Sequence, residues 1–147
     1  MQDLLNEISR QRIFQVEAET CTLIGDIISN SAPPQVLILH GAGNANRGHF
    51  RLFREQLLIH GMSSAAFDFV GHGETGGELK SSSLLSRTRQ ACSVVDSLNI
   101  QQPFSVIGAS MGAYTAVKLL EYYQVKSLIF NESDKPSIDR LGRSKYG

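Results

Sequence analysis

The sequence predicts an α/β fold: a mostly parallel sheet with helices on both faces and an antiparallel hairpin at its N-terminal edge. Three observations lead to this prediction. Short apolar runs typical of buried strands alternate with segments of helical periodicity, each pair within about 30 residues. The 147 residues, 41% hydrophobic and 19% charged, suit one globular domain. A pentapeptide at residues 108–112, Gly-Ala-Ser-Met-Gly, lies between an apolar run and a helical pattern.

The N-terminal part of the chain predicts three strands. Residues 12–29 carry two short strand-like stretches, and Pro33-Pro34 then ends regular structure. Residues 36–39 form an unbroken apolar run of the kind found in a strand buried on both faces. This run ends at a His-Gly-Ala-Gly sequence, residues 40–43, which we expect to be a flexible turn.

A helix and a fourth strand are predicted next. Between residues 49 and 61 apolar residues share one helical face, and a glycine stands at the expected helix end. Residues 65–69 predict the strand that follows. We expect Phe50, Phe53 and Phe67 to lie in the core rather than to contact a substrate.

The remaining pattern alternates in the same way. A polar stretch rich in glycine and serine, residues 74–83, precedes a helix over residues 84–98. A buried strand at residues 104–107 leads into the serine-containing turn and then into a third helix that extends to about residue 123. Residues 126–130 begin another buried strand, after which the pattern stops.

Residues 131–147 are polar, with only Ile138, Leu141 and Tyr146 as large apolar residues. Such a segment buries too little apolar surface to pack, so we expect an irregular tail. The chain therefore divides into one domain over residues 1–130 and a tail over residues 131–147.

Composition and charge exclude several classes of function. The 14 basic and 14 acidic residues balance, so no charge excess indicates binding to nucleic acid or to an anionic membrane. The sequence has no signal-peptide pattern, no apolar run that could span a membrane and no metal-ligand spacing, so we expect no cofactor and no metal. We expect Cys21 and Cys92 to be reduced structural thiols in a cytoplasmic protein.

The pentapeptide Gly108-Ala109-Ser110-Met111-Gly112 has the G-x-S-x-G pattern in the strand–turn–helix context that presents a nucleophilic serine. The serine must occupy a strained turn so that its hydroxyl stands clear of the backbone, and side chains at the glycine positions would crowd that turn. A helix that starts directly behind the serine favours negative charge beside it. The alternative interpretation is a glycine-rich turn with an unreactive serine.

Three motifs, taken in order, resemble those of the α/β-hydrolase family, in particular its small esterase, lipase and serine-aminopeptidase-like members. The first is Leu-Ile-Leu-His-Gly-Ala-Gly at residues 37–43. The second, at residues 67–77, begins Phe-Asp-Phe-Val-Gly-His-Gly and is similar to the family's D-x-x-G-x-G turn. The third is the serine turn at residues 107–114. The resemblance covers roughly residues 12–130 and implies the N-terminal portion of an α/β-hydrolase fold.

The resemblance implies roles for particular residues. Ser110 is the expected nucleophile. The backbone N–H groups of Met111 and Ala42 are the expected oxyanion hole, which stabilises the tetrahedral intermediate formed when the serine attacks a carbonyl group. Gly41 and Gly43 are expected to let their loop approach the substrate.

The four histidines and Asp68 are expected to have supporting rather than catalytic roles. His40 is a candidate substrate-binding residue, although hydrogen bonding that shapes its turn is the favoured interpretation. His72 is expected to have a structural or rim role, and His49 and His60 are expected to be polar surface residues. Asp68 is expected to fix the loop that follows it rather than to take part in chemistry.

The chain departs from the family pattern after Ser110. Family members are usually longer and place an acid and then a histidine after the serine, whereas the last histidine here is His72. Glu132 and Asp134 are the candidates for the acid position. A serine without a base is a poor nucleophile near neutral pH, so we expect a truncated or frameshifted chain that holds the N-terminal half of a hydrolase.

The expected function is hydrolysis of an ester, thioester or amide through a serine acyl-enzyme, with a small acyl-containing substrate. Two alternatives remain open: a non-catalytic remnant or binding module that keeps the serine turn, and half of an assembly in which a partner chain supplies the acid and the histidine. The strand at residues 126–130 has one edge that only the polar tail can cover, which predicts self-association.

Overall fold

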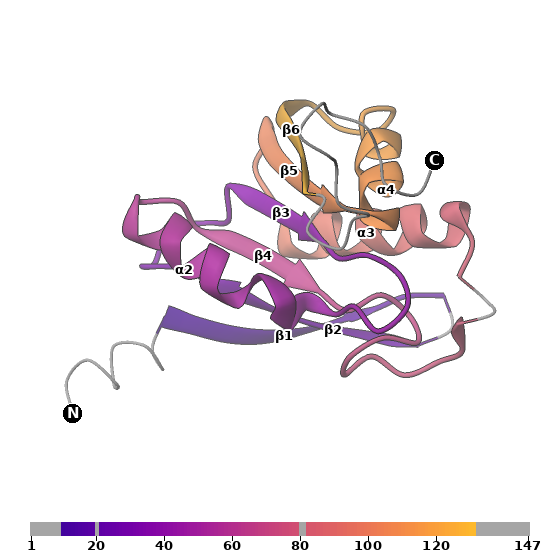
Figure 1. The fold of residues 1–147 in the computed structure, drawn as a ribbon. Helices are drawn as coiled ribbons and strands as arrows, with labels where there is room; N and C mark the ends of the chain where they lie inside the picture. Colours follow the sequence, from indigo (N-terminus) through magenta and orange to yellow (C-terminus); the bar gives the residue numbers. More distant parts are fainter. Residues whose placement is uncertain (1–9, 20, 80–81, 132–147) are drawn as a thin grey trace, which may run out of the picture.

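The computed structural model describes residues 10–19, 21–79 and 82–131, which form a six-stranded mixed sheet with helices on both faces (Figure 1). The strands are β1 Gln11–Glu17, β2 Thr22–Ile28, β3 Val36–Leu39, β4 Ser64–Phe67, β5 Phe104–Ala109 and β6 Val125–Asn131. The helices are the 3-10 helix η1 Arg47–Phe50 and the α-helices α2 Arg51–Ile59, α3 Leu84–Leu98 and α4 Met111–Leu119.

The strands follow the order β1-β2-β4-β3-β5-β6 across the sheet. β1 pairs antiparallel with β2, and β2 pairs antiparallel with β4. The pairs β3–β4, β3–β5 and β5–β6 are parallel. The predicted α/β fold with an N-terminal antiparallel hairpin is therefore confirmed.

Two groups of buried apolar residues fill the space between the sheet and its helices. α3 and α4 cover one face, where Leu37, Phe67 and Val106 belong to the larger group. η1 and α2 cover the other face, where Phe50 packs in the smaller group with Ile38. β3 contributes neighbouring residues to both groups because successive side chains of a strand point to opposite faces. Its unbroken apolar sequence thus reflects burial on both sides, as predicted.

The prediction that Phe53 lies in the core is wrong, because a buried arginine occupies the inner face of α2. Phe53 is 44% exposed, whereas Phe50, Arg54 and Leu58 are buried at four-residue spacing. Arg54 is 1% exposed, and its guanidinium group donates to the carboxylate of Asp26 in β2. Apolar periodicity gives no sign that a paired charge will replace a phenylalanine on the buried face.

The third helix is shorter than predicted. α4 ends at Leu119, and the chain continues through Tyr123 as a turn. The Tyr123 hydroxyl lies 3.2 Å from the carbonyl oxygen of Cys92 and 2.8 Å from the carboxylate of Asp96. These contacts tie the turn to α3.

Both cysteines, Cys21 and Cys92, are free thiols, as the sequence predicted. Asn131, the first residue of the predicted irregular tail, is instead the last residue of β6 and pairs with Ala109 of β5. The rest of the predicted tail, with the candidate acids Glu132 and Asp134, lies outside the described residues. Within the described ranges, no helix is long and apolar enough to cross a bilayer.

β6 forms one edge of the described sheet, and it exposes apolar side chains. Ile129 and Phe130 are 49% and 50% exposed. An apolar strand with one unpaired side is a template for pairing with another chain. We therefore expect the 147-residue chain to self-associate, which sedimentation velocity would detect as a mass that rises with concentration.

A charged side chain on the exposed edge of β6 should prevent this self-association. Ile129→Lys should shift the chain toward monomer, whereas Ile13→Lys, at a 54% exposed position on the opposite edge strand β1, should not. A monomeric mass at every concentration of the unmodified chain would contradict the prediction.

Candidate active site

The carboxyl ends of β3, β4 and β5 meet at one edge of the sheet (Figure 1). From β3 the chain crosses to β4 on one side, and it later returns to β5 on the other side of β3. Open α/β sheets bind their ligands outside the carboxyl ends of the strands, where the strand order changes direction in this way. The candidate residues directly follow β3 and β5, so the fold brings both segments to this place.

Ser110 occupies the turn between the last residue of β5 and the first residue of α4. Its backbone has φ 52° and ψ −117°, and the residue is exposed. A positive φ costs a non-glycine residue about 1–3 kcal/mol, and such strain gathers at functional sites. The strained turn that the sequence pattern predicts is therefore present, with the serine open to solvent.

The two glycines that flank Ser110 allow three backbone segments to pack closely. A Cβ atom on Gly108 would lie 2.5 Å from the carbonyl oxygen of Gly112. A Cβ atom on Gly112 would overlap the carbonyl oxygen of Leu39 at the end of β3. The glycines thus let α4 start against both β5 and β3, which fixes the direction of the turn.

The loop after β3 lies directly against Ser110. A Cβ atom on Gly41 would lie 3.2 Å from the Cβ atom of Ser110 and 3.8 Å from its Oγ atom. Gly43 has φ 69°, a conformation that favours glycine. The N–H of Ala42 has no acceptor in the described part of the chain, and the N–H of Met111 opens α4 with no partner inside that helix. The structure thus brings Gly41, Ala42, Ser110 and Met111 together.

His40 shapes the start of this loop from inside the protein. Its side chain is 1% exposed, and its Nε2 atom accepts the N–H of Phe69 at 3.0 Å. Its Nδ1 atom therefore carries the proton and donates to the carbonyl oxygen of Gly41 at 2.6 Å. Burial lowers the pKa of His40 to about 4. Both ring nitrogens are engaged with backbone, which leaves neither free for a substrate.

The low pKa of His40 predicts a loss of stability in acid. Between about pH 6.5 and pH 4 the unfolded chain binds a proton that native His40 excludes, so the free energy of unfolding should fall by about 3 kcal/mol as the pH falls. His40→Gln keeps an acceptor for the Phe69 N–H without a titrating ring. Urea unfolding at pH 7 and pH 4 should therefore show a smaller difference for His40→Gln than for the unmodified chain; equal differences would contradict this assignment.

The other histidines also lie apart from the serine hydroxyl. His72 is 4% exposed, with Nδ1 3.1 Å from the carbonyl oxygen of Ala45, and burial lowers its pKa. His49 and His60 are exposed, as predicted, and His60 bonds to a carbonyl oxygen of its own helix. All four histidines of the chain fall within the described ranges, and none of them forms a hydrogen bond with Ser110.

A buried charge cluster behind the loop was not predicted from the sequence. Asp26 of β2 accepts from Arg47 Nε at 2.8 Å and from Arg54, and Glu74 accepts from Arg47 at 3.0 Å. Burial raises the pKa of Asp26, but the guanidinium groups of Arg54 and Arg47 outweigh this effect and leave its pKa below the ordinary value. The local pattern carries no signal for this cluster, because Asp26 belongs to β2 and is distant in sequence from both arginines.

Asp68 joins this cluster to the loop, as its expected structural role requires. Its carboxylate accepts the backbone N–H of Arg47 at 2.8 Å and that of Glu74 at 3.0 Å, and it also accepts from the Arg47 guanidinium. A Cβ atom on Gly73 would overlap this carboxylate. Asp68 therefore fixes both its own turn and the end of the loop after β3.

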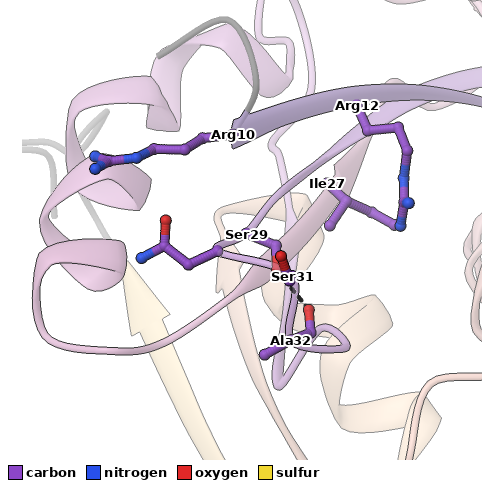
Figure 2. Close-up of a pocket in the computed structure, with 7 residues that line it drawn as sticks. Arg10, Arg12, Ile27, Ser29, Ser31 and Ala32 are labelled. Carbon is purple, nitrogen blue, oxygen red and sulfur yellow. Dashed lines mark hydrogen bonds between the residues drawn. The ribbon is translucent and has the colours of Figure 1, made fainter. Parts of the chain in front are cut away.

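A cavity of about 520 Å³ lies at the opposite end of the sheet, beside the start of β1 and the end of β2. Figure 2 shows the side chains of Arg10 and Arg12 reaching away from each other across this cavity. Because the two guanidinium groups do not converge, they do not form a common site for an anion. None of the residues that line this cavity belongs to the serine site.

Several solved structures have the same fold. A thioesterase domain from the curacin biosynthetic pathway has a TM-score of 0.72 at 23% identity, over 84% of this chain and 49% of that chain. An esterase from Pyrococcus furiosus has a TM-score of 0.68 at 25% identity, over 87% and 52%. An esterase from Exiguobacterium antarcticum has a TM-score of 0.71 at 22% identity, over 88% and 49%. The chain spans about half the length of these structures.

The sequence itself identifies the family. A comparison with curated protein sequences finds no match. Residues 31–130, well over half of the chain, match the sequence model of the family described as serine aminopeptidase, S33. The matched range contains the loop after β3, the turn after β4 and the serine turn. The chain therefore belongs to the serine aminopeptidase S33 family and has the α/β-hydrolase fold.

Proposed function

We propose that Ser110 is the nucleophile of an acyl-transfer site that acts on an ester, thioester or amide. The Oγ atom forms a bond to the carbonyl carbon of the substrate, the bond from this carbon to the leaving group breaks, and the leaving group takes up the serine proton. The observation that carries the proposal is the strained, exposed conformation of Ser110, with Gly41 packed against its Cβ atom.

The backbone N–H groups of Met111 and Ala42 form the oxyanion hole in this proposal. Both groups lack an acceptor in the described structure, and both belong to segments that adjoin Ser110. A preformed donor of this kind accelerates acyl transfer by about 10²–10³-fold, because it stabilises charge that develops only in the transition state. The start of α4 adds a favourable field for the same negative charge.

The general base is the part of the apparatus that these residues do not provide. No histidine bonds to Ser110, and an unassisted serine hydroxyl attacks slowly near neutral pH. Complete hydrolysis therefore requires a base from outside the described residues. The same observation favours a second candidate function, a non-catalytic module that keeps the serine turn without acyl transfer.

A cysteine in place of the serine tests the proposal without need of a base. A thiol at a helix N-terminus ionises readily, so the Ser110→Cys variant should accept an acetyl group from p-nitrophenyl acetate. An oxyanion hole accelerates this acylation, but it does not accelerate alkylation of the same thiol by iodoacetamide. We expect the ratio of acylation rate to alkylation rate at the introduced thiol to exceed that of an ordinary surface thiol by about a hundredfold.

The Tyr114→Cys variant supplies the matched surface thiol, because Tyr114 is 64% exposed and follows one turn later on α4. Peptide mapping by mass spectrometry separates both positions from the native Cys21 and Cys92. Equal ratios at the two introduced thiols would reject the oxyanion hole and leave the non-catalytic module as the better function.

A further inference from the structure

We propose that His72 and Arg87 are positioning residues that hold the loop of residues 41–46 so that its Ala42 N–H faces the reacting carbonyl oxygen. The proposal rests on the proposed acyl-transfer function of Ser110. Neither side chain bonds to the serine, so both would act through the loop.

His72 bonds to the middle of the loop. Its Nδ1 atom lies 3.1 Å from the carbonyl oxygen of Ala45, whose own N–H donates to the carbonyl oxygen of Ala42 at 3.3 Å. Ala45 and Ala42 therefore belong to one hydrogen-bonded turn. A displacement of Ala45 must move the residue that carries the candidate oxyanion donor.

Arg87 fixes which ring nitrogen of His72 carries the proton. Its Nη2 atom lies 3.2 Å from His72 Nε2, and a guanidinium group can only donate. Nε2 must therefore accept, so the proton resides on Nδ1 and can be donated only toward Ala45. Arg87 is itself held by the Ser82 hydroxyl at 2.8 Å and by the ring of Phe69, 4.8 Å below its Cζ atom.

The burial of Arg87 lowers the stability of the fold, so a purely structural role does not explain it. It is 2% exposed, it forms no ion pair with a carboxylate in the described ranges, and its Nη1 atom has no hydrogen-bond partner there. Burial of an unpaired guanidinium group is unfavourable. Local conflicts of this kind are expected at functional sites, where they serve a purpose other than stability.

Among the described residues, side-chain hydrogen bonds to backbone hold the rest of the loop at its two ends. His40 bonds to Gly41 at the start, and Asp68 bonds to the N–H of Arg47 at the end. Across residues 42–45, between these two anchors, the described structure contains one hydrogen bond from a side chain to the backbone, which is the bond from His72 to Ala45. His72 is thus placed to set the conformation of the middle of the loop.

Three substitutions in the Ser110→Cys chain separate positioning from folding. His72→Asn keeps an N–H donor near the Nδ1 position, His72→Gln keeps a polar group only near the Nε2 position, and His72→Leu removes both. We expect the acylation-to-alkylation ratio at the introduced thiol to fall about tenfold in His72→Leu and His72→Gln, and to stay within about threefold in His72→Asn. The alkylation rate alone should not change, since alkylation does not use the oxyanion hole.

His60→Leu is the matched control, because the His60 ring also bonds to a backbone carbonyl, that of Gln56, but on the exposed end of α2. If His72→Leu does not fold, the comparison of His72→Gln with His72→Asn still decides the question. The proposal is overturned if the introduced thiol has a raised ratio that all three His72 variants retain. An ordinary ratio at this thiol before any change at His72 would instead reject the proposed function, and the two failures are therefore distinct.

Discussion

We expect the 147-residue chain to hydrolyse p-nitrophenyl esters no faster than its Ser110→Ala variant. Attack by the serine requires removal of its proton, and none of the four histidines bonds to the hydroxyl. Loss of triad members can leave about 10³-fold catalysis over water from the oxyanion hole and binding alone. This residual rate does not use the serine, so both chains should share it. Release of p-nitrophenolate at pH 7–8 measures the difference.

A hydrolysis rate that Ser110→Ala abolishes would contradict this expectation. It would mean that a base reaches Ser110 in solution, and the proposed function would then extend from acyl transfer to full turnover. His49→Ala would then test whether the exposed His49 ring supplies this base.

We expect Asp26→Ala to destabilise the chain by about 3–5 kcal/mol, a large part of the roughly 5–15 kcal/mol that stabilises a typical domain. Asp26 is 4% exposed and pairs with both Arg47 and Arg54, which are themselves buried. Removal of the carboxylate leaves two guanidinium groups in the interior without their counter-ion. Urea unfolding followed by circular dichroism should show a lower midpoint or no cooperative transition.

Glu74→Gln provides the control from the same cluster. Glu74 pairs with Arg47 at 3.0 Å, but its side chain is 67% exposed, so solvent screens the pair and the expected loss is below about 1 kcal/mol. If Asp26→Ala and Glu74→Gln lose similar amounts of stability, the charge cluster does not hold the sheet to α2 as its burial indicates.

The elements that depend on a local pattern could be predicted from the sequence. The run at residues 36–39 is apolar at every position because β3 is buried on both faces, and the structure confirms that strand. The conformation of Ser110 could be predicted because glycines at 108 and 112 are needed where three backbone segments meet. Such requirements act within a few residues, so they leave a clear trace in the sequence.

Features that depend on contacts between distant segments could not be predicted in the same way. The pattern places Phe53 in the core because nothing in its own helix shows that Arg54 is drawn inside by Asp26, which lies 28 residues before Arg54. The bond from His72 to Ala45 likewise joins two loops that follow different strands. Partners of this kind become known only when the strand order places their loops side by side.

The most direct test of the candidate site is a crystal structure of the Ser110→Cys chain after acetylation. The thioester carbonyl oxygen should lie about 2.7–3.1 Å from the backbone nitrogens of both Met111 and Ala42. That position would show that the strained turn and the loop after β3 form one oxyanion hole. A carbonyl oxygen that points into solvent, away from both nitrogens, would contradict the account.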